Sequence, residues 1–371
     1  MTRGSSSQEA VTRGLSRNLF RCLAGLKDPR SLRACFSTEL HSTEEPDVDG
    51  DVMPDPVHEV AAAYLRYEWT EKMLLELQEN EMGDLLPELP TRFEAQRAAV
   101  ACNGTFLRTL VQEMELVSPE FASAIEEERR TSNVGFVGAV LKQLLREWTE
   151  SGAGERQQCL GTVAEALQKH LPPPATEGAP RPRVLVPGAG LGRLAWDLAL
   201  RGYQCLGIER AMTMLLTGAF VVEFLLPNGR SLDICPFVHA SSGPNNVADS
   251  KHLSRRVNVP DSAALEAARS TGADVSIQTA FRMCAADFGR LAFEEAHTST
   301  WDAVLFCFYI DACGDVVSAV DAAYNALRAG GLLISCGPLE YDGTDGGHNV
   351  RSCARCRPLF GHPSLQPHPV R

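Results

Sequence analysis

Three glycines follow a short apolar run in the segment VLVPGAGLG, residues 184–192. Gly188 and Gly190 can adopt positive φ angles and place no side chain between the backbone and a ligand, while Gly192 allows a helix to begin close to the preceding strand. A glycine turn between a strand and a helix predicts close approach to a nucleotide-like ligand. A turn that binds nothing is the structural alternative.

The spacing of these glycines distinguishes two classes of ligand. A dinucleotide fingerprint is G-x-G-x-x-G, whereas here the third glycine comes one residue early and Arg193 occupies the expected position. The spacing GxGxG is common in S-adenosylmethionine-dependent methyltransferases, whose cofactor has no pyrophosphate to place at the helix N-terminus. We therefore expect S-adenosylmethionine, and the spacing disfavours an NAD-dependent oxidoreductase.

Acidic residues follow the next two predicted strands. Glu209 ends the second strand, 21 residues after Gly188, where a carboxylate can accept hydrogen bonds from both ribose hydroxyls. Asp287 and Phe288 end the third strand and suit the amine and the ring face of an adenine. Capping of the next helix is the alternative role for Glu209, and an ordinary turn is the alternative for Asp287.

The fourth predicted strand lies in the segment WDAVLFCFYIDAC. This segment places Cys307 within the sheet and Asp311 at the carboxyl end, over the position where a methyl group should sit. Packing is the alternative for Cys307, and capping of the following helix is the alternative for Asp311.

Two regions with different patterns must position these residues. Apolar residues at helical spacing predict helices over residues 57–80, Thr91–Val117, Val134–Trp148 and Glu155–His170, and the proline run after them marks a boundary near residue 175. After this boundary, strands are expected over Val184–Val186, Gln204–Ile208, Val275–Ala285, Ala303–Tyr309 and Leu332–Cys336. Helices are expected between them, over Leu191–Arg201, Ala211–Leu226 and Val316–Arg328. An irregular insertion is expected from Pro227 to about Gly272. This alternation predicts an open parallel sheet that binds ligands at the carboxyl ends of its strands.

Composition limits the classes of partner. The chain has 371 residues, of which 44% are hydrophobic, and a net charge of −12, which argues against a nucleic-acid backbone as the main partner. A small-molecule substrate fits better. Twelve scattered cysteines suit a reducing compartment. The longest apolar stretch, Met212–Leu226, is shorter than the roughly 20 residues of a membrane span, so no membrane partner is expected.

The ends of the chain differ from its middle. We expect a disordered segment over residues 1–55, a helical region over 56–175, a cofactor-binding domain over 176–342 and an unstructured tail over 343–371. The expected location is the cytoplasm, with the nucleus as a second compartment, while the basic N-terminal residues leave an organelle transit segment as the alternative. The tail contains Cys353 and Cys356, but a single CxxC does not make a structural zinc site, so no metal is expected. A homodimer is left open.

These features together resemble the carnosine N-methyltransferase family, whose members carry a long N-terminal helical region before a methyltransferase sheet. The matching segments are LKQLLREW, VLVPGAGLGRLAWDLALRGY, GIER, AADF, WDAVLFCFYIDAC and AGGLLISCGPLEY, which span about residues 57 to 341. The segment PGAGLGRLAW is quite specific, because most methyltransferases have an acidic residue near the position of this proline. The implied fold is α/β, a Rossmann-like class I methyltransferase sheet with an N-terminal helical extension.

The resemblance also implies a set of cofactor-binding residues. They are Gln143, Arg146, Gly188, Gly190, Glu209, Asp287, Phe288 and Cys307. Gln143 and Arg146 lie three residues apart and so share one helix face, which their spacing alone would assign to solvent. By resemblance they would reach the cofactor from the helical extension.

Asp311 would contact the imidazole of a histidine-containing dipeptide. A neutral imidazole nitrogen is already a nucleophile, so methyl transfer needs the ring held in line with the sulfonium methyl group and in one tautomer. A carboxylate bonded to the other ring nitrogen fixes that tautomer, and this is the catalytic role expected of Asp311. The implied activity is methylation of an imidazole nitrogen of carnosine to give anserine, or of a related histidine-containing di- or tripeptide.

Two departures from the family pattern affect the substrate side. After GPL-x-Tyr the family has a substrate-binding histidine, whereas this chain has Asp342, which becomes the candidate there. The family's closing helix and antiparallel strands, with a substrate-binding tyrosine, are missing, which would leave the strand over Leu332–Cys336 near a sheet edge with uncovered apolar faces. The alternative hypothesis is a truncated, catalytically impaired protein that binds S-adenosylmethionine and acts through protein contacts.

Overall fold

The computed structural model describes residues 55–82, 89–128, 130–176, 178–238, 250–271 and 279–338. These residues belong to two compact units. Among them, the sheet unit contains the described residues of 155–211 and 279–338, and the helical unit contains those of 55–154 and 212–271. The helix predicted over Glu155–His170 therefore belongs to the sheet unit rather than to the helical region.

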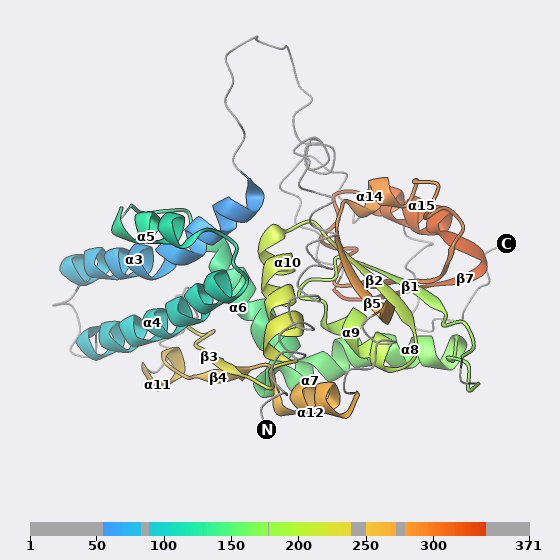
Figure 1. The fold of residues 1–371 in the computed structure, drawn as a ribbon, viewed down its shortest axis with the longest axis horizontal. Helices are drawn as coiled ribbons and strands as arrows, with labels where there is room; N and C mark the ends of the chain where they lie inside the picture. Colours follow the sequence, from blue (N-terminus) through green and yellow to red (C-terminus); the bar gives the residue numbers. More distant parts are fainter. Residues whose placement is uncertain are drawn as a thin grey trace, which may run out of the picture. The chain divides into compact units, whose positions relative to one another are not determined.

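The sheet unit is built on five parallel strands (Figure 1). The strands are β1 (Arg183–Pro187), β2 (Gln204–Glu209), β5 (Phe281–Ala285), β6 (Trp301–Cys307) and β7 (Leu327–Cys336). Their order across the sheet is β5-β2-β1-β6-β7. The chain thus moves outward in one direction from β1 to β5 and in the other direction from β6 to β7. This reversal is the topological switch point of a doubly wound fold, and it confirms the predicted α/β class.

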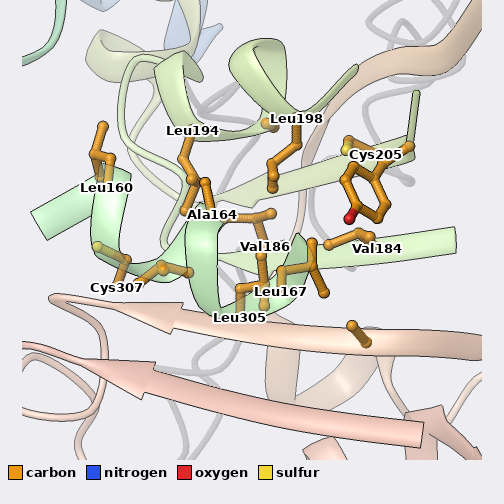
Figure 2. Packing of buried hydrophobic residues seen from close by; sticks show 14 of the residues in the cluster. Leu160, Ala164, Leu167, Val184, Val186, Leu194, Leu198, Cys205, Leu305 and Cys307 are labelled. Atoms are coloured by element: carbon orange, nitrogen blue, oxygen red, sulfur yellow. The ribbon is translucent and has the colours of Figure 1, made fainter. Parts of the chain in front are cut away.

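Alternating side chains of the strands build a core on each face of the sheet. Val184 and Val186 of β1 pack with α8 (Thr162–His170) and α9 (Arg193–Leu200), as do Leu305 and Cys307 of β6 (Figure 2). Leu185 of β1 packs on the opposite face with α14 (Phe288–Leu291) and α15 (Val316–Ala326). Because both faces of these strands are covered, their sequences are continuously apolar.

The helical unit combines two distant segments of the chain. Its first segment forms α3 (Pro56–Met82), α4 (Leu89–Glu113), α5 (Pro119–Glu127) and α6 (Gly135–Trp148). Its second segment forms α10 (Met212–Ala219), a π-helical turn over Phe220–Leu225, the antiparallel strands β3 (Leu232–Ile234) and β4 (Val257–Val259), α11 (Ser250–Leu253) and α12 (Ser262–Thr271). The Tyr64 hydroxyl of α3 hydrogen-bonds with Thr217 Oγ1 of α10 at 2.9 Å and joins the two segments.

Several predicted elements differ from those observed. The insertion predicted to be irregular contains β3, β4, α11 and α12. The two strands were not predicted, because strands of three residues are too short to show an alternating pattern. The strand predicted from residue 275 begins at Phe281, after two helical residues, and residues 275–278 lie outside those described. The strand predicted to reach residue 309 ends at Cys307, because Phe308 adopts a left-handed φ of 55°.

Strand β7 is longer than expected and is partly covered. It begins at Leu327 rather than at residue 332, and it lies at one edge of the sheet among the described residues. Leu332, Ile334 and Cys336 pack against the core shared with α8 and α9, so the expectation of uncovered apolar faces is wrong for that face. Leu333, on the other face, is 37% exposed. Among the described helices, none is long and apolar enough to cross a membrane.

Candidate functional site

The carboxyl ends of β1, β2, β5 and β6 meet at one edge of the sheet, at the switch point between β1 and β6. Gly188 directly follows β1, and Glu209 is the last residue of β2. Asp287 follows β5 by two residues, and Asp311 follows β6 by four. The fold therefore brings these four predicted residues to one edge, as the order of strands and motifs indicated.

The glycine turn has the backbone conformation that its sequence predicts. Gly188, Gly190 and Gly192 have φ values of 63°, 58° and 85°, and Gly192 caps the N-terminus of α9. The space beside Gly188 is not empty, however. A Cβ atom on Gly188 would lie 2.7 Å from Cδ2 of Tyr309, so the ring of this tyrosine packs against the turn. A ligand at the turn would therefore have Tyr309 as a neighbour.

Glu209 holds the turn through its side chain. One carboxylate oxygen accepts a hydrogen bond from the Gly190 N–H at 2.9 Å. The other accepts from the N–H groups of Arg210 at 2.8 Å and Ala211 at 2.9 Å, just before α10 begins. A carboxylate has about four acceptor positions, so three are already used. One ribose hydroxyl could donate to the remaining position. A second hydroxyl would have to share an acceptor position with one of the backbone N–H groups or displace that group.

Asp287 and Phe288 have clear structural roles. Asp287 caps α14 by accepting from the Arg290 N–H at 3.1 Å, and its other oxygen lies 3.5 Å from the Arg210 guanidinium. Phe288 is 2% exposed and packs edge-on against Phe306 and Tyr309. The turn role weighed for Asp287 is thus present, and adenine binding by this pair stays a prediction.

The end of β6 contains a residue that the sequence did not single out. Cys307 is 8% exposed and belongs to the apolar cluster under α8 and α9 (Figure 2), which is the packing role weighed for it. The left-handed Phe308 then turns the chain, and Tyr309 follows it at the glycine turn. Burial raises the pKa of Tyr309, and the charges of Asp287 and Glu209 act in the same direction. The hydroxyl of Tyr309 is therefore neutral.

Asp311 differs from the other acidic residues at this edge. Its side chain is partly buried, and its Oδ1 atom is buried without a hydrogen-bond partner among the described residues. Buried carboxylate oxygens in native proteins are nearly always hydrogen-bonded, so an oxygen without a donor points to a ligand. An N–H or O–H group would satisfy it. Asp342 lies outside the described residues, as do Cys353 and Cys356.

Gln143 and Arg146 belong to the helical unit, on the second half of α6. Both side chains are partly buried, unlike the solvated face that their spacing suggests. The Gln143 amide donates to the carboxylate of Glu147, which is one turn further along the helix and only 3% exposed. This pairing orients the Gln143 side chain. Cofactor binding by Gln143 and Arg146 stays a prediction.

The types of residue at this edge of the sheet are those that an adenosyl cofactor needs. The turn is built from glycines with positive φ, and the carboxylate of Glu209, at the end of β2, has one acceptor position left. At the end of β6, the neighbour of β1, Asp311 offers a buried oxygen that has no partner among the residues described. We find no pyrophosphate-type G-x-G-x-x-G spacing in the turn, which disfavours a dinucleotide.

Comparison with known proteins gives consistent matches. The family model for carnosine N-methyltransferase matches residues 123–353. The Mus musculus carnosine N-methyltransferase is 29% identical over 277 residues, which are 73% of this chain and 65% of the mouse protein. The Schizosaccharomyces pombe carnosine N-methyltransferase is 31% identical over 224 residues, which are 60% of this chain and 57% of that protein. The chain thus spans less than two thirds of the length of these relatives.

A solved structure from Methanococcus maripaludis, described as an S-adenosylmethionine-dependent methyltransferase, covers 52% of this chain and 65% of that chain. The sequence identity is 15% and the TM-score is 0.26.

Proposed function

Because the chain belongs to the carnosine N-methyltransferase family, we propose that it methylates an imidazole nitrogen of carnosine, with S-adenosylmethionine as the methyl donor. The product would be anserine, and related histidine-containing di- or tripeptides are the other substrates that we propose. When bound, the cofactor supplies a methyl group on a positively charged sulfur. The protein must then position a nucleophile that is already reactive.

The observation that carries this proposal is the Oδ1 atom of Asp311 at the carboxyl end of β6, which is buried and has no hydrogen-bond partner within the described part of the chain. An imidazole N–H is a donor that this oxygen lacks. Accepting that hydrogen bond would fix the tautomer of the substrate ring and leave the lone pair of the other nitrogen free to attack. Asp311 would not need to remove a proton in the methyl-transfer step.

The remaining residues at this edge would hold the cofactor. In our proposal the glycine turn lies along the adenosyl group, Glu209 accepts hydrogen bonds from the ribose, and Asp287 accepts one from the adenine amine. Gln143 and Arg146 of α6 would contribute from the helical unit, and Asp342 would contact the substrate. These assignments rest on the family resemblance and on the positions of the residues within each unit.

Two measurements on the purified chain test the proposal. Isothermal titration calorimetry with S-adenosylhomocysteine measures cofactor binding, and NAD is the control ligand. Mass spectrometry of a reaction with S-adenosylmethionine and carnosine measures anserine. We expect binding of S-adenosylhomocysteine, no binding of NAD, and anserine formation.

The outcomes separate the hypotheses. Cofactor binding without anserine, and without methylation of other histidine-containing peptides, would favour the non-catalytic alternative that acts through protein contacts. Absence of S-adenosylhomocysteine binding would overturn both hypotheses. Binding of NAD with hydride transfer would restore the oxidoreductase that the glycine spacing disfavours.

A further inference from the structure

Glu147 is a carboxylate on the apolar face of α6. The buried residues of this helix include Val140 and Leu144, and Glu147 follows them at helical spacing, seven and three residues later. Glu147 is only 3% exposed. Burial of a carboxylate destabilises a fold unless hydrogen bonds compensate, and an apolar residue would fill the same position without that cost. The position therefore fits a role that needs an oxygen acceptor.

This acceptor serves Gln143, one turn earlier on the same helix. The Nε2 atom of Gln143 donates to Oε1 of Glu147. A carboxylate has no N–H group, so only the NH2 end of the Gln143 amide can face it, and the carbonyl oxygen of the amide points away. Gln143 is partly exposed, and within the described part of the chain its carbonyl oxygen accepts no hydrogen bond. Glu147 thus determines that Gln143 offers an acceptor to a ligand rather than a donor.

The end of α6 is held in place by the turn that follows it. Thr149 is fully buried, and its Oγ1 atom donates to the Leu145 carbonyl at 2.7 Å and accepts from the Gly152 N–H at 3.2 Å. A Cβ atom on Gly152 would lie 2.0 Å from the Leu145 carbonyl oxygen and 2.7 Å from that of Arg146, so the turn packs directly on the helix end. Side chains on a support of this kind lose little freedom when a ligand binds.

An oxygen acceptor beside a guanidinium suits the two charged groups of an α-amino acid. Arg146 lies three residues after Gln143 and projects from a neighbouring position of α6. A guanidinium pairs with a carboxylate, and a carbonyl oxygen accepts hydrogen bonds from an ammonium group. S-adenosylmethionine has an ammonium group and a carboxylate on one carbon, at its methionyl end.

We propose that Glu147 is a positioning residue, which orients the Gln143 amide so that its carbonyl oxygen accepts from the ammonium group of the cofactor, while Arg146 pairs with the carboxylate on the same carbon. This inference rests on the proposed function, because it takes Gln143 and Arg146 as cofactor-binding residues. Glu147 acts through Gln143 and does not contact the cofactor. It is not among the residues that the family resemblance implies.

Two ligands separate the amino-acid end of the cofactor from the rest. S-adenosylhomocysteine contains this end, whereas 5′-methylthioadenosine keeps the adenosine and the thioether but lacks it. Isothermal titration calorimetry of the full chain measures both affinities. Glu147→Met has a side chain of similar length without an acceptor. In this variant the affinity for S-adenosylhomocysteine should fall about tenfold or more, and that for 5′-methylthioadenosine should stay within about twofold.

Matched variants distinguish the acceptor from simple packing. In Glu147→Gln the new amide oxygen still accepts from Gln143, so this variant should keep most of the affinity that Glu147→Met loses. Gln143→Met should lose the same affinity as Glu147→Met, and the double variant should lose no more than either, because all of them remove one interaction. Lys142→Met, at an exposed position of α6, is the control and should bind like the wild type.

An exchange of the two side chains gives a test that does not depend on the folding of Glu147→Met. In Gln143→Glu two carboxylates would face each other without a donor between them, so S-adenosylhomocysteine should bind more weakly. When Gln143→Glu is combined with Glu147→Gln, the amide at position 147 donates to the carboxylate at position 143, whose other oxygen is left for the ammonium group. The exchanged chain should therefore recover the affinity. Thermal melting checks that each variant is folded.

The results separate this inference from the proposed function. A wild-type chain that does not bind S-adenosylhomocysteine would overturn both. If the wild type binds it, three results would overturn the positioning role alone: equal binding by folded Glu147→Met and Glu147→Gln, an equal proportional loss for the two ligands in Glu147→Met, or no recovery in the exchanged chain.

Discussion

The three carboxylates at the carboxyl edge of the sheet differ in how many donors they have. Glu209 accepts from three backbone N–H groups, and Asp287 accepts from the first turn of α14 and faces Arg210. Oδ1 of Asp311 is buried and has no donor among the described residues. At the level of single residues, Asp311 is therefore the carboxylate that is ready to accept a hydrogen bond from a substrate.

We expect Asp311→Asn to separate catalysis from cofactor binding. An amide in this position offers an N–H toward the substrate ring and selects the wrong tautomer, so anserine formation should fall by about 100-fold or more. Affinity for S-adenosylhomocysteine should stay within a few-fold, measured by isothermal titration calorimetry. Asp321→Asn, at an exposed position of α15, is the control and should change neither quantity. Equal loss of turnover and of cofactor affinity in Asp311→Asn would mean that the aspartate is structural.

A second residue-scale prediction concerns Glu223, in the π-helical turn after α10. Burial raises the pKa of this carboxyl from 4.5 to about 8. In the folded chain Glu223 therefore keeps its proton between these two pKa values, whereas in the unfolded chain it loses it. Since the folded state binds more protons in that window, the free energy of unfolding falls as the pH rises through it.

Glu223→Gln should remove this dependence. One pKa unit corresponds to about 1.4 kcal/mol, and the partial access of the side chain to water reduces the effect. For the wild type we therefore expect the free energy of unfolding to fall by an amount on the order of 2 kcal/mol between about pH 5 and about pH 9. Urea unfolding at several pH values measures it. Glu126→Gln, at an exposed position of α5, is the control and should follow the wild type. Parallel pH profiles for wild type and Glu223→Gln would refute the burial argument.

At the scale of elements, the turn between β1 and α9 depends on the residue that packs against it. Gly188 has a φ of 63°, and a methyl group there would approach the Tyr309 ring to 2.7 Å. That ring is in turn packed against Phe288 and Phe306. The turn, the end of β6 and the start of α14 are therefore mechanically linked through aromatic packing.

Gly188→Ala should consequently disturb both stability and binding. The alanine would carry strain from its positive φ and would displace the Tyr309 ring, at a cost of about 1–3 kcal/mol in unfolding free energy. We also expect weaker binding of S-adenosylhomocysteine. Gly314→Ala is the matched control, because a methyl group there meets nothing within 4 Å. If urea unfolding gives the same free energy for both variants, the proposed role of Tyr309 packing is wrong.

Elements with strong local patterns could be predicted from the sequence. The apolar runs of β1 and β2 and the periodic face of α6 set their bounds to within one residue of those observed. The strands β3 and β4 could not be predicted, because three residues carry too little pattern. The π-helical turn after α10 was also hidden, since its apolar residues continue the helical spacing.

The candidate site was predictable in its order but not in its contacts. Residues that follow parallel strands must meet at one edge, so Gly188, Glu209 and Asp311 could be grouped from sequence alone. The packing of Tyr309 against the turn depends on the left-handed Phe308, which no local pattern indicated. Gln143 was assigned only through the family resemblance.

At the scale of the whole molecule, the part of the chain that the structure describes passes between its two units three times. It leaves the helical unit after Gly154, returns at Met212, and leaves again after Gly272. The helical unit is thus assembled from two segments that share one core. Tyr64 hydrogen-bonds with Thr217, and Asn103 holds the backbone of Cys235. Neither segment has its buried polar groups satisfied without the other.

A chain that begins at Glu155 should therefore be unstable, although it contains all five strands of the parallel sheet. Without α3 and α4, residues 212–272 would lose the partners of Thr217 and Cys235, and Phe220 and Ile234, which are fully buried in the intact chain, would become exposed. We expect strong binding of a hydrophobic dye, a lower melting temperature and rapid proteolysis within 212–272. A chain that begins at residue 55 keeps these contacts and is the matched control. If the chain from Glu155 melts cooperatively at the temperature of that control, the second segment must fold without the first, and the helical unit would not be a single cooperative unit.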